Sequence, residues 1–285
     1  MLEGWNEFYT EEEIEKIHKI ELISFDVFSD VCKKLGIKFF MYGGSLLGTV
    51  KYQGVIPWDD DLDIAFLRED YEKFILEAPS LLPENYEIQH PKVNKKTPYH
   101  YIKFRRRDTK LVEYKNHKVK INHGVYFDIY PIDNIPDNYE DYLSQKLEYD
   151  KWISIFQVRQ NFRIDRKISS AKDLAITSLR LFQSLIAHLF SLSFLIGKID
   201  DISTKYNGEQ TNLQGCLSFP KPNNYFNGVD FVSATFEGRE VFIPSGYKVN
   251  LINRYGDINR LPPEEKRVGH KPYILSLESE ETECL

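Results

Sequence analysis

The amino-acid sequence predicts an α/β (α+β) fold: a mixed sheet core flanked by helices, with an appended helical segment and a small β-rich region. Three observations support this prediction. Apolar residues recur at helical spacing before residue 36, short β-rich segments then alternate with turns and helical patterns, and longer helical patterns follow. The 285 residues, 42% of them hydrophobic, suffice for one large domain or two small ones.

The N-terminal part shows clear boundary signals. Thr10 followed by Glu13 is a capping-box pattern, and Gly36 is a plausible helix stop. The β-rich IKFFMY ends at a glycine pair, which predicts a strand entering a tight turn. The expected elements are, in order, a helix to residue 35, a strand at 37–42, a short helix from Ser45, a strand at 61–66 and a helix at 68–78.

The rest of the chain is divided by composition. Strands are expected at 86–90, 99–107, 110–114 and 124–132, a helix at 139–159, and a hairpin around Gly238 in FEGREVFIP. We therefore expect five parts: an N-terminal helix (1–35), a mixed α/β core (36–135), a helical insertion (136–215), a β/turn region (216–275) and an acidic tail (276–285).

One apolar stretch, residues 179–198, approaches the length of a membrane span. Because Arg180, Gln183 and His188 interrupt it, we expect a buried helix or one packed on the catalytic domain. Two alternatives stay open. Arg180 and Lys198 flank the run as in a helix at the membrane interface, and a true span is the other alternative.

Composition excludes several classes of protein. A net charge of −6 is unlike the basic domains that bind nucleic acid. The three cysteines are widely spaced without a CxxC pair, which argues against a zinc site and a disulfide framework. The N-terminal residues lack the pattern of a secretory signal. We therefore expect a cytoplasmic location, with contact at the inner face of the membrane as the open alternative.

Four aspartates lie close together in PWDDDLDIAF. In extended chain Asp59, Asp61 and Asp63 share one face and Asp60 takes the other. Such an oxygen-only set suits Mg²⁺ or Mn²⁺. A solvated acidic loop is one alternative. A calcium loop is another, but Ile64 stands where that loop needs glycine.

The glycine turn precedes these acids. Gly43, Gly44 and Ser45 end a strand and begin a helix, so their N–H groups can face an anion. A phosphate held there, with Mg²⁺ bridging it to Asp61 and Asp63, would make a phosphoryl-transfer site.

These motifs carry a resemblance. GSLLG (44–48) and PWDDDLD (57–63) resemble the LicD family, whose members, with the fukutin-related proteins, are phosphotransferases of nucleotidyltransferase fold. YFDIYPID, YIKFRRRDT and the region from FEGREVFIP to His270 resemble later family segments in the family's order. The similarity covers about residues 37–270.

The resemblance implies that Asp61 and Asp63 are the catalytic metal-binding pair, with Asp59 a supporting ligand and Asp128 the third carboxylate. Asp128 lies in the apolar strand VYFDIYPI, where an ionised side chain without a partner is costly. This favours a metal-binding or general-base role over a hydrogen-bonded structural aspartate. Asp133 is expected to start a turn.

Other site residues are basic or lie near the C-terminus. Lys103 and Arg105 are candidates for phosphate contact, although a solvated edge strand would also carry such charges. Tyr255 and Asp257 resemble a family segment that closes the site, or form a simple turn. His270 is a candidate for phosphate binding or catalysis, against a surface role.

The family resemblance also implies a reaction. A CDP-activated alcohol would donate its phospho-alcohol to a sugar hydroxyl of a surface glycan, such as lipopolysaccharide, teichoic acid or capsule, or of a lipid-linked glycan, and CMP would leave. CDP-choline is the expected donor, with CDP-ribitol and CDP-glycerol as rivals. An ordinary nucleotidyltransferase and a non-enzymatic scaffold are the alternatives.

Overall fold

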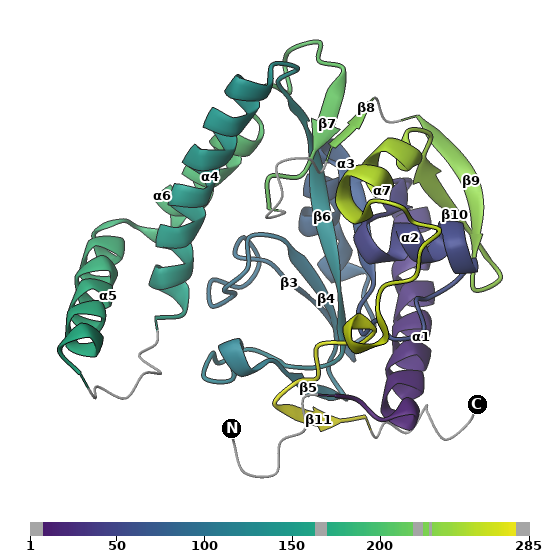
Figure 1. Ribbon diagram of the computed structural model, residues 1–285, viewed down its shortest axis with the longest axis horizontal. Helices are drawn as coiled ribbons and strands as arrows, with labels where there is room; N and C mark the ends of the chain where they lie inside the picture. Colours follow the sequence, from purple (N-terminus) through teal and green to yellow (C-terminus); the bar gives the residue numbers. More distant parts are fainter. Residues whose placement is uncertain (1–7, 163–169, 219–224, 228–229, 278–285) are drawn as a thin grey trace.

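A mixed β-sheet organises the protein (Figure 1). The computed structural model describes residues 8–162, 170–218, 225–227 and 230–277. The sheet order is β1-β2-β6-β4-β3, with β2 parallel to β6 and the other neighbours antiparallel; β7 and β8 extend it along β6. This arrangement confirms the α/β class. The sheet strands are β1 (Phe39–Met41), β2 (Asp63–Leu67), β3 (Tyr86–Gln89), β4 (Ile102–Arg106), β6 (Tyr126–Ile135), β7 (Leu213–Gly215) and β8 (Tyr225–Asn227).

Three helices precede or connect these strands: α1 (Glu11–Leu35), α2 (Gly43–Tyr52) and α3 (Arg68–Glu77). Thr10 and Glu13 form the expected capping box, and Gly36 ends α1 in the left-handed conformation. The expected start of α2 at Ser45 is wrong. The helix begins two residues earlier, so the glycine pair forms its first turn.

One face of the sheet carries the apolar core. The ring of Phe28 on α1 lies 5.4–5.9 Å from the rings of Phe66, Phe104 and Phe127, which come from β2, β4 and β6. Helix α3 adds Phe74 to this cluster. Because side chains alternate along strands, the residues next to each of these phenylalanines in the sequence point to the opposite face of the sheet. That face carries polar side chains.

The helical segment stands beside the sheet and consists of α4 (Tyr139–Gln160), α5 (Ala171–Leu189) and α6 (Leu192–Ser203) (Figure 1). Helices α4 and α6 share a small core that includes Tyr149, Phe156, Leu195 and Ile199. None of the described helices alone is long and apolar enough to cross a membrane. Residues 174–189 and 192–203 qualify only as a pair, which bends by 90°.

The expectation of one buried helix at 179–198 is therefore wrong. Helix α5 ends at Leu189, and a new helix, α6, begins at Leu192. Ser191 caps α6 by accepting a hydrogen bond from the Phe194 N–H group. Helix α6 buries its apolar side, whereas α5 leaves several large apolar side chains exposed. Those side chains are Leu174, Leu179, Leu181, Phe182, Leu185 and Leu189.

The C-terminal part is more helical than expected. The hairpin around Gly238 is confirmed as β9 (Phe231–Phe236) and β10 (Arg239–Pro244), joined at Glu237 and Gly238, both with positive φ. Helix α7 (Tyr247–Tyr255) was missed, because strands and turns were expected there. Strand β11 (Ile274–Ser276) pairs with β5 (Lys110–Val112). Most of the acidic tail lies outside the described residues.

Candidate active site

Three charged side chains lie side by side across the polar face of the sheet. Asp63 of β2 is in register with Asp128 of β6, and Asp128 with Lys103 of β4. All three side chains are buried, with 7%, 5% and 1% exposure. Buried charges are costly unless they are paired. The row therefore sets two acids beside a single adjacent base.

Lys103 and Tyr130 hold Asp128. The Lys103 Nζ donates to Asp128 Oδ1 at 2.7 Å, and the Tyr130 hydroxyl donates to Oδ2 at 3.2 Å. Burial raises the pKa of Asp128 although the charge of Lys103 opposes this. The Lys103 ammonium also lies 3.3 Å from the centroid of the Tyr126 ring. A carboxylate so oriented, with a raised pKa, is equipped to accept a proton.

The remaining aspartates crowd one another. Burial and the charges of Asp63 and Asp60 raise the pKa of Asp59 to about 7. Burial, followed by the charges of Asp63 and Asp59, raises the pKa of Asp61 as well. Like charges at close range disfavour ionisation of both. The cluster would thus be stabilised by a cation shared among its carboxylates.

The N-terminus of α2 contacts this cluster directly. The Gly44 N–H group donates to Asp63 Oδ2 at 2.9 Å, and the Ser45 hydroxyl accepts from the Asp63 N–H group at 2.8 Å. A Cβ atom on Gly43, where φ is +52°, would stand 1.9 Å from Asp63 Oδ2. The glycine pair was expected to face a phosphate. In the structure, the Gly44 N–H group faces the Asp63 carboxylate instead. The glycine turn therefore positions Asp63.

Asp60 has a separate set of partners. Its carboxylate accepts from the Tyr9 hydroxyl at 2.8 Å and from the His270 N–H group at 2.9 Å. The His270 ring, 91% exposed, lies 3.4 Å from the same carboxylate. His270 therefore joins the acidic loop from the side of Asp60. The contact ties the C-terminal segment and the N-terminus to the loop.

Arg105 does not fit the phosphate contact expected for it. Its fully buried guanidinium donates to Gln89 Oε1, the Gly124 carbonyl and the Tyr99 hydroxyl. The alternative of a solvated edge strand is also wrong, because β4 lies between β6 and β3. Lys103 is equally buried and is engaged by Asp128. Both basic side chains are therefore buried and hydrogen-bonded to other residues of the protein.

The segment around α7 contributes differently from expectation. Asp257 is exposed and accepts from the Asn259 N–H group, so it closes its own turn rather than reaching the acids. Tyr255 is 39% exposed, and its ring lies 5.2 Å from the Arg254 guanidinium. Arg254 was not predicted from the sequence: burial raises the pKa of Asp63, and the charge of Arg254 opposes that rise. Arg254 is a cation from a distant helix that acts on the acidic cluster.

Glu21 on α1 is a second buried charged residue near the acids that was not predicted from the sequence. This side chain is 1% exposed, and neither carboxylate oxygen has a hydrogen-bond partner among the described residues. Burial and the charges of Asp60 and Asp59 raise its pKa well above the ordinary value. A signal existed: Glu21 lies four residues after Ile17 and four before Phe25, within the apolar stripe of the helix. A glutamate in such a stripe indicates a special environment.

The acids fit a hard divalent cation. Among the described residues, no three Asp, Glu, His or Cys side chains already converge as a metal ligand set. Mg²⁺, however, is usually held by one or two carboxylates together with waters and substrate phosphates. A cavity of about 10 Å³, the room that one water molecule needs, is lined in part by Gly44, Asp59 and Asp61. The oxygen-only donors and the crowding of negative charge agree with such an ion.

Comparison with known proteins assigns this geometry to a family. Residues 36–165 match the model of "LicD/FKTN/FKRP, nucleotidyltransferase domain". The protein carries a LicD-family domain. The resemblance drawn from PWDDDLD is thereby confirmed, and the LicD domain contains the whole Asp63–Asp128–Lys103 row.

Two relatives extend this result. The chain is 25% identical over 261 residues to the lipopolysaccharide cholinephosphotransferase LicD of Haemophilus influenzae, covering 88% of this chain and 94% of the relative. It is 34% identical over 109 residues to an uncharacterised protein of Rickettsia typhi, covering 38% and 33% of the two chains. The first similarity reaches well beyond the LicD domain, into the helical and C-terminal segments.

Proposed function

We propose that the protein is a metal-dependent phosphotransferase that moves phosphocholine from CDP-choline onto a sugar hydroxyl of a cell-surface glycan. The observation that carries this proposal is the buried row of Asp63, Asp128 and Lys103 within the LicD domain, flanked by Asp59 and Asp61. The similarity to a cholinephosphotransferase over nearly its full length supports the choice of reaction.

Each side chain has a role in this reaction. The sugar oxygen attacks the phosphorus of the phosphocholine group, a new P–O bond forms, the bond to the CMP phosphate breaks, and CMP leaves. Asp128 accepts the hydroxyl proton, since Lys103 and Tyr130 fix its orientation. Asp59 adds a further carboxylate to the cluster, and a bound cation would favour its ionised form, because burial and the charges of Asp63 and Asp60 raise its pKa to about 7.

Asp61 and Asp63 would hold Mg²⁺ or Mn²⁺, with Asp59 and Asp128 within the same cluster. The ion would supply charge neutralisation on the donor's two phosphates. Arg254 of α7 adds a positive charge that favours the ionised form of Asp63. The Gly44 N–H group donates to the Asp63 carboxylate at 2.9 Å, and the Ser45 hydroxyl accepts from the Asp63 backbone N–H group at 2.8 Å. Together these bonds fix the position of Asp63.

Choline is favoured as the alcohol because aromatic rings lie next to the acids. A quaternary ammonium binds to the faces of tyrosine or tryptophan rings. Tyr101 and Tyr42 lie 5.0 and 5.8 Å from the ring of Tyr130, on the face that carries Asp128. Tyr99, Tyr101 and Tyr126 surround the Lys103 ammonium. Tyr130, whose hydroxyl donates to Asp128, is therefore the proposed choline contact, and the fully buried ring of Tyr42 packs against it.

Product analysis tests the proposal. The purified chain is incubated with Mg²⁺, CDP-choline and a glycan acceptor, and nucleotides are separated by chromatography. CMP and a phosphocholine-modified glycan are the expected products. Pyrophosphate release from a nucleoside triphosphate would instead support an ordinary nucleotidyltransferase. Thermal shifts with CDP-ribitol, CDP-glycerol and CDP-ethanolamine rank the donors, and a larger shift with one of these than with CDP-choline would replace choline.

We also propose that the protein acts in the cytoplasm, at the inner face of the membrane, on a lipid-linked acceptor, and without nucleic acid. The exposed apolar side chains of α5 support membrane contact, since an amphipathic helix of this kind can lie in the lipid headgroup region. Flotation of the protein with phosphatidylglycerol vesicles tests this. Protein that stays at the bottom of the gradient would exclude the contact.

A further inference from the structure

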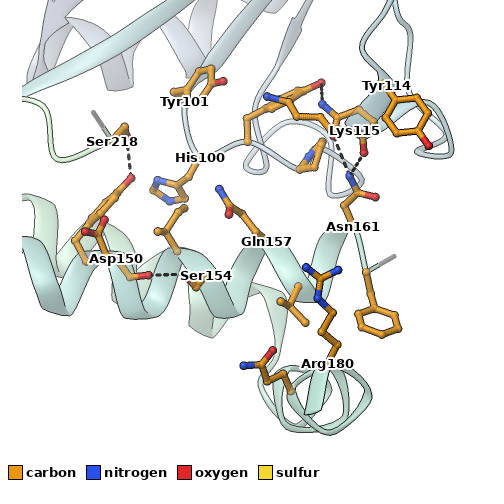
Figure 2. A pocket seen from close by; sticks show the side chains of 18 of the residues that line it. His100, Tyr101, Tyr114, Lys115, Asp150, Ser154, Gln157, Asn161, Arg180 and Ser218 are labelled. Carbon is orange, nitrogen blue, oxygen red and sulfur yellow. Dashed lines mark hydrogen bonds between the residues drawn. The ribbon is translucent and has the colours of Figure 1, made fainter. Parts of the chain in front are cut away.

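A cavity of about 780 Å³ lies between the loop before β4 and the helical segment (Figure 2). The loop provides Tyr99, His100 and Tyr101, and α4 provides Asp150 and Gln157. Cavities of roughly 300–1,000 Å³ are typical of small-molecule sites. This cavity is much larger than the space of about 10 Å³ beside Asp59 and Asp61.

The cavity shares a wall with the acidic site. The rings of Tyr99 and Tyr101 have their centroids 4.9 and 5.5 Å from Lys103 Nζ, which in turn holds Asp128. Tyr101 also contacts the ring of Tyr130, whose hydroxyl donates to Asp128. A ligand against Tyr101 is thus separated from the proposed general base by one layer of side chains.

The lining suits an uncharged, polyhydroxylated ligand better than a diphosphate. Its lysines are already neutralised, because Lys146 is bound to Asp150 and Lys115 lies 3.2 Å from Glu113. Arg180 reaches the cavity from α5, at its outer side (Figure 2). The amide of Gln157 points into the space and donates no hydrogen bond to any described residue.

We infer that this cavity binds the acceptor sugar, as a neutral hexose or N-acetylhexosamine unit of the glycan; the inference rests on the proposed function. Tyrosine rings offer flat apolar surfaces to the C–H faces of a sugar ring, while an amide and a carboxylate bond its hydroxyls. The donor would occupy the side of Gly44, Asp61 and Asp63. The glycan would then continue past Tyr101, so that the reacting hydroxyl reaches Asp128.

Direct binding tests the inference independently of turnover. Methyl glycosides of galactose, glucose and N-acetylgalactosamine serve as probes in saturation-transfer NMR with the full-length protein. We expect signals for at least one glycoside, weakened about tenfold or more in affinity by Gln157→Leu, which keeps the size but removes the amide. Gln210→Leu, at an exposed position outside the cavity, is the matched control and should bind like the wild type.

Kinetics separate this inference from the proposed function. With CDP-choline as donor, Gln157→Leu should raise the KM for the glycoside about tenfold and leave the KM for CDP-choline unchanged. A rise in the KM for CDP-choline would assign the cavity to the donor and overturn the inference. Equal glycoside binding by wild type and Gln157→Leu, or no binding of any probe, would overturn it too. Absence of CMP release by the wild type would refute only the proposed function, because the NMR experiment does not need turnover.

Discussion

The polar face of the sheet and helix α5 differ in which kind of side chain they bury and which kind they expose. On the sheet, charged side chains are buried and each is held by a specific partner: Asp128 by Lys103, and Asp63 by Gly44. On α5, apolar side chains such as Leu185 and Leu189 are exposed, at 69% and 82%. One region hides charge, and the other displays apolar surface.

The difference teaches where this chain depends on other molecules. Buried acids with raised pKa values would be stabilised by a cation, so under the proposed function the sheet binds a small ion and a phosphate-bearing substrate. The exposed leucines of α5 would instead be covered by an apolar surface. Substitutions should therefore affect activity at the sheet and association at α5, and the following predictions test that division.

The largest effect is expected for Asp63→Asn. This change removes one carboxylate of the proposed metal pair but keeps an oxygen that can accept from Gly44, so the fold should persist. CMP release should fall at least about 1,000-fold, because transition-state charge would lose several kcal/mol of stabilisation. Asp141→Asn, on the exposed side of α4, is the control. Activity of Asp63→Asn within tenfold of wild type would remove Asp63 from the metal site.

Lys103→Met should have the largest effect on stability. It leaves Asp128 buried without its cation, which typically costs about 3–5 kcal/mol. Urea unfolding measures the loss. The double variant Lys103→Met with Asp128→Leu should recover most of the stability but stay inactive, since an apolar pair can replace a buried ion pair. Lys33→Met, at an exposed pair with Asp30, should be nearly neutral. Loss of stability in the double variant equal to that in the single one would contradict this account.

Gly43→Ala tests the contact between α2 and the acids. The new methyl group would overlap Asp63 Oδ2 and would sit on a residue with positive φ. We expect the carboxylate to move, and activity to fall about 100-fold, as misplacement near 1 Å can cost that much. Gly208→Ala is the matched control, because its Cβ would meet no atom within 4 Å. Equal activity of the two variants would show that α2 does not position Asp63.

Local signals made much of the fold predictable. The capping box at Thr10 and the hairpin at Gly238 depend on neighbouring residues, and both are confirmed. Each strand expected in the core is present, but most strand ends differ from the expected ones by one to three residues. The D-x-D pattern likewise drew attention to Asp61 and Asp63 before any geometry was known. Helix α7 was missed because it is short: its nine residues lie between Gly246 and Gly256, and glycine is typical of turns.

Long-range partners were not predictable in the same way. That Lys103 faces Asp128 follows from the register of β4 against β6, which no local pattern fixes. Arg105 was misjudged for the same reason, since its partners Gln89 and Gly124 come from other segments. The break between α5 and α6 depends on how α6 packs against α4. Burial is a property of the assembled chain.

A smaller effect, where the loop before β4 packs against α4, concerns pH. His100 lies 5.8 Å from the ring of Phe156 on α4, and burial lowers its pKa to about 4. The unfolded chain binds this proton more readily, so the stability is complete above about pH 6.5 and is lost as the pH falls toward 4. His100 alone should account for about 2 kcal/mol between pH 7 and pH 5. His100→Gln should flatten this slope in urea unfolding, and an unchanged slope would contradict the assignment.

The smallest effect on stability is expected on α5, where Leu185→Ser should change the free energy of unfolding by no more than about 0.5 kcal/mol. The matched change on α6, Leu195→Ala, empties a fully buried site and should cost about 2–5 kcal/mol. Association should follow the opposite order. Leu185→Ser combined with Leu189→Ser should reduce flotation with phosphatidylglycerol vesicles several-fold, whereas Leu195→Ala should float like the wild type at a temperature where it is folded. If the α5 variant were strongly destabilised, its leucines would be structural, and the contrast between a sheet face that buries charge and a helix that exposes apolar side chains would fail.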